Sequence, residues 1–208
     1  MKNSSIHFIK KLLLTLKDLK MTAYHHYGNN IYSIPKFIYF SLFKINTFII
    51  VGIDLDNKLP KLDIEPEFKI IKPTIDELDR LRSGKDLPRE FYYDKIHGIK
   101  KCYIVLCQNE LAYIHWVYLK GDKNRFLVLS DDVAELNYNT TLPKFRGRKL
   151  MAKMVAYIVR DLKKEGYKKV VGLTHSQNIA SIKSVKRAGF KELGKVKAFG
   201  PFNMKVRV

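Results

Sequence analysis

The stretch Thr141-Leu142-Pro143-Lys144-Phe145-Arg146-Gly147-Arg148-Lys149-Leu150 decides the fold, because it leads from a strand into a helix through a short basic turn. Before it, polar and apolar residues alternate over residues 133–142, which predicts a strand. After it, apolar residues recur at helical spacing over residues 149–165, and Gly166 ends that helix. The stretch therefore predicts a strand–turn–helix unit of an α/β domain.

The start of this helix is a candidate anion site. A helix start carries up to four unpaired N–H groups and the positive end of the helix dipole. Arg146, Arg148 and Lys149 add full positive charges beside it. The turn lacks the glycine spacing of a phosphate loop or of a dinucleotide fingerprint. Either a bound diphosphate or a basic surface turn of an α/β domain would explain it.

The segments around this unit also alternate between strands and helices. Thr74, with Glu77 three residues later, forms a capping box, which predicts a helix through about residue 82. Strands come first, and strand–helix–strand–helix–strand follows, which predicts an α/β (mixed α+β) domain with a mixed sheet and helices on both faces. We expect further helices at 87–96 and 179–188, and further strands at 68–71, 103–107, 112–119, 125–130, 169–174, 190–196 and 202–208.

Residues 1–64 are predicted to form an extension that precedes a domain of residues 65–208. Apolar residues at helical spacing predict an amphipathic helix over 6–20. Pro35 is then expected to interrupt regular structure, and two apolar runs at 37–43 and 48–53 predict a β-hairpin. The polar stretch that follows, with two prolines, predicts a linker or a crossing loop.

Residues 178–190 form a second informative segment, which a helix and a strand of suitable length join to the turn at 143–150. The two segments together carry a family resemblance. Pro143, Arg146 and Gly147 lie in the turn, and Asn178 and the pair Gly189-Phe190 bound the short helix. Together, over residues 67–200, they resemble the GNAT superfamily of acyl-CoA-dependent N-acetyltransferases. The resemblance implies a GNAT-like central sheet, mixed but mostly antiparallel, flanked by helices. It also implies that acetyl-CoA, or another acyl-CoA, is a co-substrate whose acyl group is transferred to an amine.

The resemblance also implies which residues bind the acyl-CoA. The end of the strand, at Asn139, Thr141 and Leu142, would hold the pantetheine. Asn178 would contact the same arm, Ser181 lies one turn further along that helix, and Lys186 could meet the adenosine phosphates. The diphosphate would be held by Arg146, Gly147, Arg148, Lys149, Leu150, Met151 and Ala152.

This sequence departs from the family pattern at three positions. Lys149 replaces the second glycine of the turn, and Met151 replaces a small residue. Val185 replaces a tyrosine that in the family can protonate the leaving thiolate. Another group or water then acts as the acid, or the domain binds acyl-CoA without efficient catalysis.

A polar stripe on the strand 133–142 supplies the candidate base. Acyl transfer to an amine needs such a base, which often acts through water. Glu135 is the only carboxylate in the stripe and is our first candidate; a salt-bridged or solvated Glu135 is the alternative. His115 and His175, on the neighbouring strands, are second candidates, and each could instead be a structural histidine. One face of the strand is predicted to carry Glu135, Asn137, Asn139 and Thr141, and the other Ala134, Leu136 and Tyr138.

The net charge of +19 is unevenly distributed. Residues 142–197 hold 16 Lys and Arg against 3 Asp and Glu, whereas the centre of the chain is nearly neutral. The positive segment is the one that would face the CoA phosphates. A basic nucleic-acid-binding protein is the competing hypothesis, but no basic–aromatic recognition motif supports it. The bias toward Lys, Ile and Asn could also reflect genome composition.

The remaining features of the sequence limit the partners and the cellular compartment that we expect. Cys102 and Cys107 fit reduced packing residues in a cytoplasmic protein, and no metal-ligand spacing surrounds them. No signal-peptide pattern or stretch long enough to span a membrane is recognised. We expect an acyl-CoA and an amine of unknown identity as partners. A homodimer and peripheral contact of residues 6–20 with the inner face of a membrane stay open, whereas nucleic acid is not expected.

Overall fold

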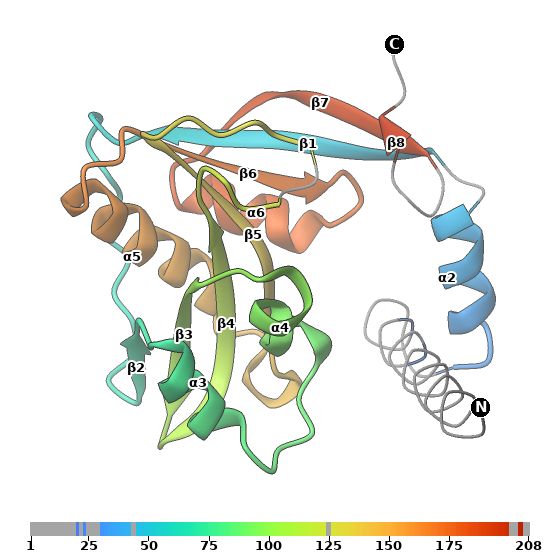
Figure 1. The fold of residues 1–208 in the computed structure, drawn as a ribbon, viewed down its shortest axis with the longest axis horizontal. Helices are drawn as coiled ribbons and strands as arrows, with labels where there is room; N and C mark the ends of the chain where they lie inside the picture. Colours follow the sequence, from blue (N-terminus) through green and yellow to red (C-terminus); the bar gives the residue numbers. More distant parts are fainter. Residues whose placement is uncertain are drawn as a thin grey trace, which may run out of the picture. The chain divides into compact units, whose positions relative to one another are not determined.

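The computed structural model describes Lys20, Ala23 and residues 30–42, 45–123, 126–199 and 204–205. The chain divides into two compact units. One unit comprises Met1–Asn46 and Ala198–Val206, and the other comprises Thr47–Lys197 and Arg207–Val208. The second unit carries the sheet and its covering helices (Figure 1).

In the first unit, the described part contains helix α2 (Ser33–Leu42) and the short pairing of Ala198 and Phe199 with strand β8 (Met204–Lys205). The predicted β-hairpin is therefore wrong, because residues 37–42 belong to α2. Pro35 lies in the first turn of α2, where its missing N–H is not needed, so it does not interrupt the helix. A run of apolar residues alone does not distinguish a buried strand from a helix. The helix predicted over residues 6–20 lies outside the described residues, apart from Lys20.

The second unit is built on a mixed sheet whose strand order is β2-β3-β4-β5-β6-β1-β7. The pairs β2–β3, β3–β4, β4–β5 and β6–β1 are antiparallel, and β5–β6 is parallel. This arrangement confirms the mixed α/β fold. The strands are β1 (Ile45–Asp54), β2 (Phe68–Ile71), β3 (Lys101–Cys107), β4 (Glu110–Tyr118), β5 (Val133–Thr141), β6 (Lys169–His175) and β7 (Lys191–Phe199).

Strand β1 changes the domain boundary expected from the sequence. Residues Phe48–Asp54 pair with Lys169–His175 of β6, so β1 is a strand of the sheet and the compact unit begins at Thr47 rather than at residue 65. The predicted linker that follows β1 packs onto the same unit. Leu55 is buried there, and Arg160 donates a hydrogen bond to the Pro60 carbonyl oxygen at 2.7 Å.

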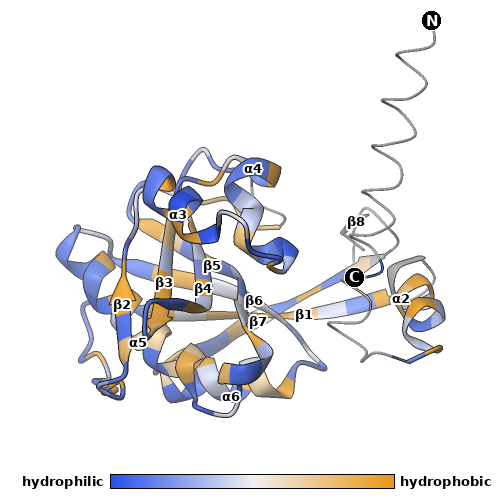
Figure 2. Cartoon of the chain, turned by 90° about the horizontal axis from the view of Figure 1, so that it is seen from below, coloured by the Kyte–Doolittle hydropathy of each residue, from blue (hydrophilic) through white to orange (hydrophobic). Residues whose placement is uncertain are grey.

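Helices cover both faces of this sheet, as Figure 2 shows for α3 and α4 on one side and α5 and α6 on the other. Their bounds are α3 (Ile75–Arg82), α4 (Tyr93–His97), α5 (Leu150–Lys164) and α6 (Ile179–Arg187). The capping box predicted at Thr74 is confirmed, because its hydroxyl accepts from the Glu77 N–H at 3.2 Å and the Glu77 side chain accepts from the Thr74 N–H at 2.8 Å. The helical piece predicted at 87–96 is split into a 3₁₀ turn (Arg89–Tyr92) and α4. The strand predicted at 125–130 is absent from its described part, residues 126–130.

Two apolar clusters hold the sheet between these helices. The first includes Val155 and Leu162 of α5 and Val185 of α6, packed on β4 and β5. The second includes Leu78 of α3, Tyr93 of α4 and Trp116 of β4. Full burial of one such aliphatic side chain is worth about 1.5–3 kcal/mol, so α5, with eight buried residues, is a major source of stability.

The indole N–H of Trp116, in the second cluster, and the nearby Arg82 guanidinium are both paired. Trp116 donates its indole N–H to the Glu90 carbonyl oxygen at 2.6 Å. Arg82, only 3% exposed, forms ion pairs with Asp79 and Asp94 and donates to the Phe91 carbonyl oxygen at 2.6 Å. These contacts anchor α3 and the segment before α4 on the sheet.

Candidate functional site

Strands β5 and β6 separate in the middle of the sheet. Their parallel pairing runs from Val133 with Lys169 to Leu136 with Gly172 and then stops. Beyond that point, β5 stays paired with β4, and β6 stays paired with β1. A Cβ atom on Gly172 would lie 3.0 Å from the Leu136 carbonyl oxygen, so glycine allows the close approach of the last parallel pair. The divergence leaves the backbone edges of two central strands open.

A β-bulge in β5 accompanies the divergence. His115 of β4 lies opposite Asn139, whereas the next residue, Trp116, lies opposite Asn137. Tyr138 is therefore the extra residue of the bulge, and it has a φ of 49°, a left-handed conformation that bulky residues rarely adopt. The bulge corrects the predicted polar stripe. Glu135 and Asn137 share a face with Trp116, whereas Asn139 and Thr141 share the opposite face with His115.

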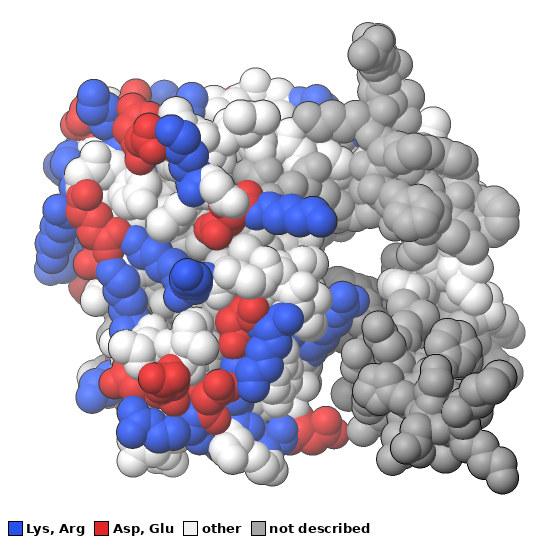
Figure 3. All heavy atoms as spheres, viewed as in Figure 1, with Lys and Arg blue, Asp and Glu red and all other residues white. Residues whose placement is uncertain are grey.

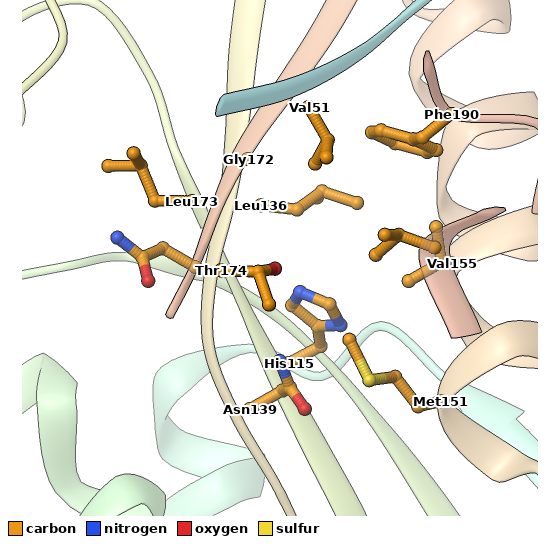
Figure 4. Close-up of a pocket in the computed structure, with 12 residues that line it drawn as sticks. Val51, His115, Leu136, Asn139, Met151, Val155, Gly172, Leu173, Thr174 and Phe190 are labelled. Carbon is orange, nitrogen blue, oxygen red and sulfur yellow. The ribbon is translucent and has the colours of Figure 1, made fainter. Parts of the chain in front are cut away.

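A cavity with a volume of about 20 Å³ lies at the divergence, on the side of α5 and α6 (Figure 4). Met151 and Val155 of α5, Val185 of α6 and Phe190 give it an apolar wall, as does Val51 of β1. His115, Asn139 and Thr174 give it a polar wall, and Asn137, which contacts Glu135, also lines it. The volume suits a group about the size of one water molecule or one methyl group.

Glu135 is completely buried on the α3 and α4 side of the sheet. Its Oε1 atom accepts a hydrogen bond from the Asn137 side-chain amide at 3.0 Å. The Asn137 Oδ1 atom in turn accepts from the Tyr138 N–H at 2.9 Å. Asn137 therefore connects the carboxylate to the bulge. Burial, with a smaller effect of nearby groups that include Glu135, raises the pKa of the Tyr118 hydroxyl far above its ordinary value.

The two histidine candidates differ in their surroundings. His115 is 1% exposed and lines the cavity; its Nδ1 atom lies 2.7 Å from the Tyr113 hydroxyl, and its Nε2 atom has no hydrogen-bond partner among the described residues. Burial lowers the pKa of His115 to about 3, so the ring is neutral near pH 7. His175 ends β6, and its Nδ1 atom accepts from the Gln177 N–H at 3.2 Å. Its ring contacts Phe48 edge-on, with the ring centroids 5.3 Å apart.

The three predicted catalytic residues therefore do not form one cluster. His115 lines the cavity, Glu135 lies on the opposite face of the sheet, and His175 is not among the cavity residues. Val185 does line the cavity, but its side chain has no acidic proton to donate.

The turn at residues 143–149 leads directly into helix α5. Pro143–Phe145 form a 3₁₀ turn, Gly147 has a φ of 84°, and Lys149 is the N-cap of α5 with a φ of 57°. Lys149 thus adopts a conformation that favours glycine. Among the described residues, no side chain caps α5, and its first turn holds no acidic residue. Leu150 and Ala152 are buried, so these residues can offer a ligand only their backbone N–H groups, whereas Met151 reaches the cavity.

The end of β5 presents its backbone groups in two directions. Leu142 donates its N–H to the Ala112 carbonyl oxygen at 2.9 Å and accepts from the Phe145 N–H at 2.9 Å, so its backbone is already engaged. Backbone groups of successive strand residues point to alternate edges. The N–H and C=O groups of Asn139 and Thr141 therefore point away from β4, toward the edge from which β6 diverges. The Thr141 carbonyl oxygen accepts from Arg146 Nε at 3.3 Å.

Three basic side chains near this turn have acidic partners. Arg148 pairs with Glu67, Lys144 pairs with Glu110, and Lys153 pairs with Glu65. The hydrogen bond from Lys153 is the main cause that lowers the pKa of Glu65. Figure 3 shows acidic side chains interspersed among the basic ones on one face of the molecule. That face is not a surface of a single charge sign.

The second predicted segment forms the start of α6. Asn178 is the N-cap of this helix, and its Oδ1 atom accepts from the Ser181 N–H at 3.1 Å. Asn178 therefore has a capping role that would explain its presence without a ligand. Lys186 is exposed in the last turn of α6.

Sequence reasoning missed three parts of the site. The bulge at Tyr138, the close approach at Gly172 and the contribution of Val51 from β1 were not expected. Val51 was assigned to the extension. The pair of asparagines that flank Tyr138 is the one local feature that could have pointed to the bulge, because Asn often occupies irregular backbone positions.

Within the described residues, no group of three or more histidine, cysteine, aspartate or glutamate side chains is placed to hold a metal ion. No described helix is both long and apolar enough to cross a lipid bilayer.

Solved structures of similar fold come from several organisms. A Drosophila protein is 15% identical, with a TM-score of 0.55, and the match covers 74% of this chain and 50% of that one. An acetyltransferase from the GNAT family of Novosphingobium aromaticivorans is 14% identical, with a TM-score of 0.54 and coverages of 75% and 64%. A GCN5-related glucosamine N-acetyltransferase region of a fungal multi-domain β-N-acetylglucosaminidase is 12% identical, with a TM-score of 0.57 and coverages of 74% and 21%. The chain thus spans less than two thirds of each of these proteins, and the likeness shows the fold.

A comparison with family models supplies the family. No curated protein matches the sequence. The model of the acetyltransferase (GNAT) family matches residues 75–190, from the first residue of α3 to Phe190, which is more than half of the chain. The matched region holds the bulged strand, the uncapped helix start and the cavity wall of α5 and α6. This chain belongs to the acetyltransferase (GNAT) family.

Proposed function

We propose that this protein transfers an acetyl group from acetyl-CoA to the amine of an acceptor. One observation carries the proposal. Met151, the second residue of α5, lines the cavity, so the uncapped helix start and the cavity at the strand divergence adjoin. A CoA diphosphate at the helix start would then bring its thioester arm to the open strand edges.

The residues around the site fit such a ligand. The backbone N–H groups of Leu150, Met151 and Ala152 would bind the diphosphate, together with Arg146 and Gly147 of the turn. Arg148 and Lys149 would add charge, and Arg148 would exchange Glu67 for a phosphate. The open edges of Asn139 and Thr141 would pair with the pantetheine amides, and Leu142 would contribute its side chain. Asn178 and Ser181 would adjoin the arm while keeping the cap of α6, and Lys186 would meet an adenosine phosphate.

The size of the cavity favours a short acyl group. Its volume of about 20 Å³ is close to what one methyl group needs. We therefore propose acetyl-CoA rather than a longer acyl-CoA as the donor.

Glu135 is the proposed general base. It is the described carboxylate on the strand that diverges, and Asn137 fixes its Oε1 atom. The acceptor nitrogen would form the C–N bond as the carbonyl π electrons move to oxygen. Collapse would then break the C–S bond and release the CoA thiolate, while the amine proton passes through water to Glu135. Asn137, which lines the cavity, would link Glu135 to it, whereas His175, whose Nδ1 atom already accepts from the Gln177 N–H, is assigned no part in these steps.

Two measurements test the proposal. Calorimetric titration with acetyl-CoA should show binding, and Arg146→Ala should weaken it by about tenfold, the loss of one charge-assisted contact. Lys163→Ala, an equal charge change in the last turn of the same helix, is the matched control and should bind normally. Indifference of the protein to acetyl-CoA at millimolar concentration would refute the function.

Turnover separates the enzyme from a module that only binds acyl-CoA. Release of CoA thiol, measured across a library of amines, should identify an acceptor, and Glu135→Gln should then lower kcat by about 100-fold while acetyl-CoA affinity is kept. Binding without thiol release from any amine would favour the acyl-CoA-binding module that Val185 suggests.

The remaining proposals concern partners and compartment. Nucleic-acid binding is disfavoured because Arg148, Lys144 and Lys153 already pair with carboxylates. A steep salt dependence of DNA or RNA binding that CoA does not affect would reverse this view. Cys102 and Cys107 are free thiols, which suits the reducing cytoplasm.

A further inference from the structure

The cavity contains one buried polar group whose hydrogen-bonding capacity is unused. Four polar residues line it, and Figure 4 shows three of them, His115, Asn139 and Thr174, grouped on one side, near Met151. Among the described residues, the Nε2 atom of His115 is buried without any hydrogen-bond partner. An unpaired buried polar atom costs about 1–3 kcal/mol, so this position is poised to gain energy from a ligand.

The hydrogen bond at the other ring nitrogen determines what Nε2 can do. Burial raises the pKa of the Tyr113 hydroxyl well above its ordinary value, so this hydroxyl keeps its proton. In the described structure, the hydroxyl's one hydrogen-bond contact is His115 Nδ1, at 2.7 Å. If Nδ1 carried a proton, the Tyr113 proton would have no acceptor in the core. The hydroxyl therefore donates to Nδ1, and in the neutral ring the proton lies on Nε2.

We infer that the Nε2–H group of neutral His115 donates a hydrogen bond to the carbonyl oxygen of the bound thioester, with Tyr113 as the positioning residue. This role rests on the proposed function. The apolar wall of Met151, Val155 and Val185 would hold the acyl methyl group, and the polar wall would hold the thioester oxygen. The donor is built into a buried strand, so it needs no reorganisation when charge develops on that oxygen.

His115 transfers no proton in this step. When the acceptor nitrogen attacks, the carbonyl π electrons move to the oxygen, and the Nε2–H bond to that oxygen shortens as its charge grows. When the C–S bond breaks, the electrons return and the thiolate leaves with the sulfur electron pair. His115 starts and ends as a neutral imidazole, so it is a hydrogen-bond donor rather than a general acid or base. This role differs from that of the base expected from the sequence.

The test is nuclear magnetic resonance of the imidazole rings in ¹⁵N-labelled protein, with and without acetyl-CoA. The chain has six histidines, and His115→Leu identifies the signals of His115 by their loss. The free protein at about pH 7 should show His115 neutral, with its proton on Nε2. Tyr113→Phe should mix the two tautomers, because no hydroxyl then donates to Nδ1. His175→Gln, a histidine change outside the cavity wall, should leave the His115 signals unchanged.

Ligand addition gives the second readout. Acetyl-CoA should shift the Nε2–H proton, whereas CoA, which binds through the same phosphates but has no thioester carbonyl oxygen, should shift it far less. With an acceptor in hand, His115→Leu should lower kcat about 100-fold with little change in KM for acetyl-CoA, and His115→Gln should recover part of the loss.

The outcomes separate the inference from the function. If acetyl-CoA binds in the calorimeter and the Nε2–H proton does not move, the role of His115 is wrong and the function stands. A proton on Nδ1 in the free protein, or a charged ring at about pH 7, also overturns the role. If acetyl-CoA does not bind, the function fails, and this role fails with it.

Discussion

The neutral state of His115 makes the stability of the fold depend on pH in a calculable way. Burial lowers the pKa of this side chain from 6.5 to about 3. Between these two values, the unfolded chain binds a proton that the folded chain excludes. Stability therefore rises with pH, is fully present above about pH 6.5 and falls as the pH is lowered toward 3.

The magnitude follows from the same two values. Between about pH 7.5 and about pH 5, protonation of this one histidine in the unfolded chain lowers the free energy of unfolding by about 2 kcal/mol. Such a loss is a sizeable fraction of the total stability of about 5–15 kcal/mol that is typical of a domain. His115→Leu removes the group that titrates and places an apolar side chain in the cavity wall that Met151 also lines.

Urea unfolding at the two pH values measures this contribution. The difference in free energy between them should be about 2 kcal/mol smaller in His115→Leu than in the natural protein. Because the comparison is a difference of differences, the carboxylates and the other histidines cancel. His175→Gln is the matched control and should follow the natural protein. Equal pH dependence in the natural protein and His115→Leu would refute the buried, neutral state of His115.

Three further substitutions test other parts of the structure. Lys149→Gly should raise the free energy of unfolding by about 1 kcal/mol, because glycine relieves the left-handed conformation, whereas Lys149→Ala should not; urea titration at neutral pH would decide. Met151→Ala should enlarge the cavity and let the protein bind butyryl-CoA as tightly as acetyl-CoA, and calorimetry that still shows a preference for acetyl-CoA would contradict the assignment of the cavity. Arg82→Met should cost about 3–5 kcal/mol, because Asp94 is left buried without its partner, and a stability loss below about 1 kcal/mol would show that this ion pair is unimportant.

Local patterns in the sequence predict most of the secondary structure of the main unit. The capping box at Thr74 and the apolar stripe of α5 are both local devices, and both are found where expected. The start of α5 also follows from local chemistry, since proline, glycine and arginine at a strand–helix junction predict a turn and a helix start there.

Long-range pairing is what local patterns do not contain. The strand β1 was expected, but its partner β6 lies more than a hundred residues away, so residues near β1 suggested a hairpin instead. The sequence does not predict the bulge at Tyr138, for a related reason. Polar residues at 135, 137, 139 and 141 keep strict alternation in the sequence, and only the register against β4 reveals that Tyr138 is an extra residue. The candidate site was therefore assembled on one face of the sheet, although the structure divides it between two.

The unpaired Nε2 of His115 is a property of packing. A histidine on a strand is equally compatible with an exposed ring, an ion pair or a buried neutral ring. Only the contact with Tyr113 and the surrounding apolar wall distinguish these states.

The pairing of Glu67 with Arg148 and of Glu65 with Lys153 has a consequence for selectivity. These glutamates, from the segment that crosses α5, act as internal counter-ions for the most basic part of the chain. An incoming anion must displace a tethered carboxylate, which returns as soon as the anion leaves. A single phosphate or a passing polyanion gains little from that exchange. Under the proposed function, a diphosphate that also accepts hydrogen bonds from the N–H groups of the helix start would gain enough to displace the glutamates, so these carboxylates would select for a diphosphate over a single phosphate.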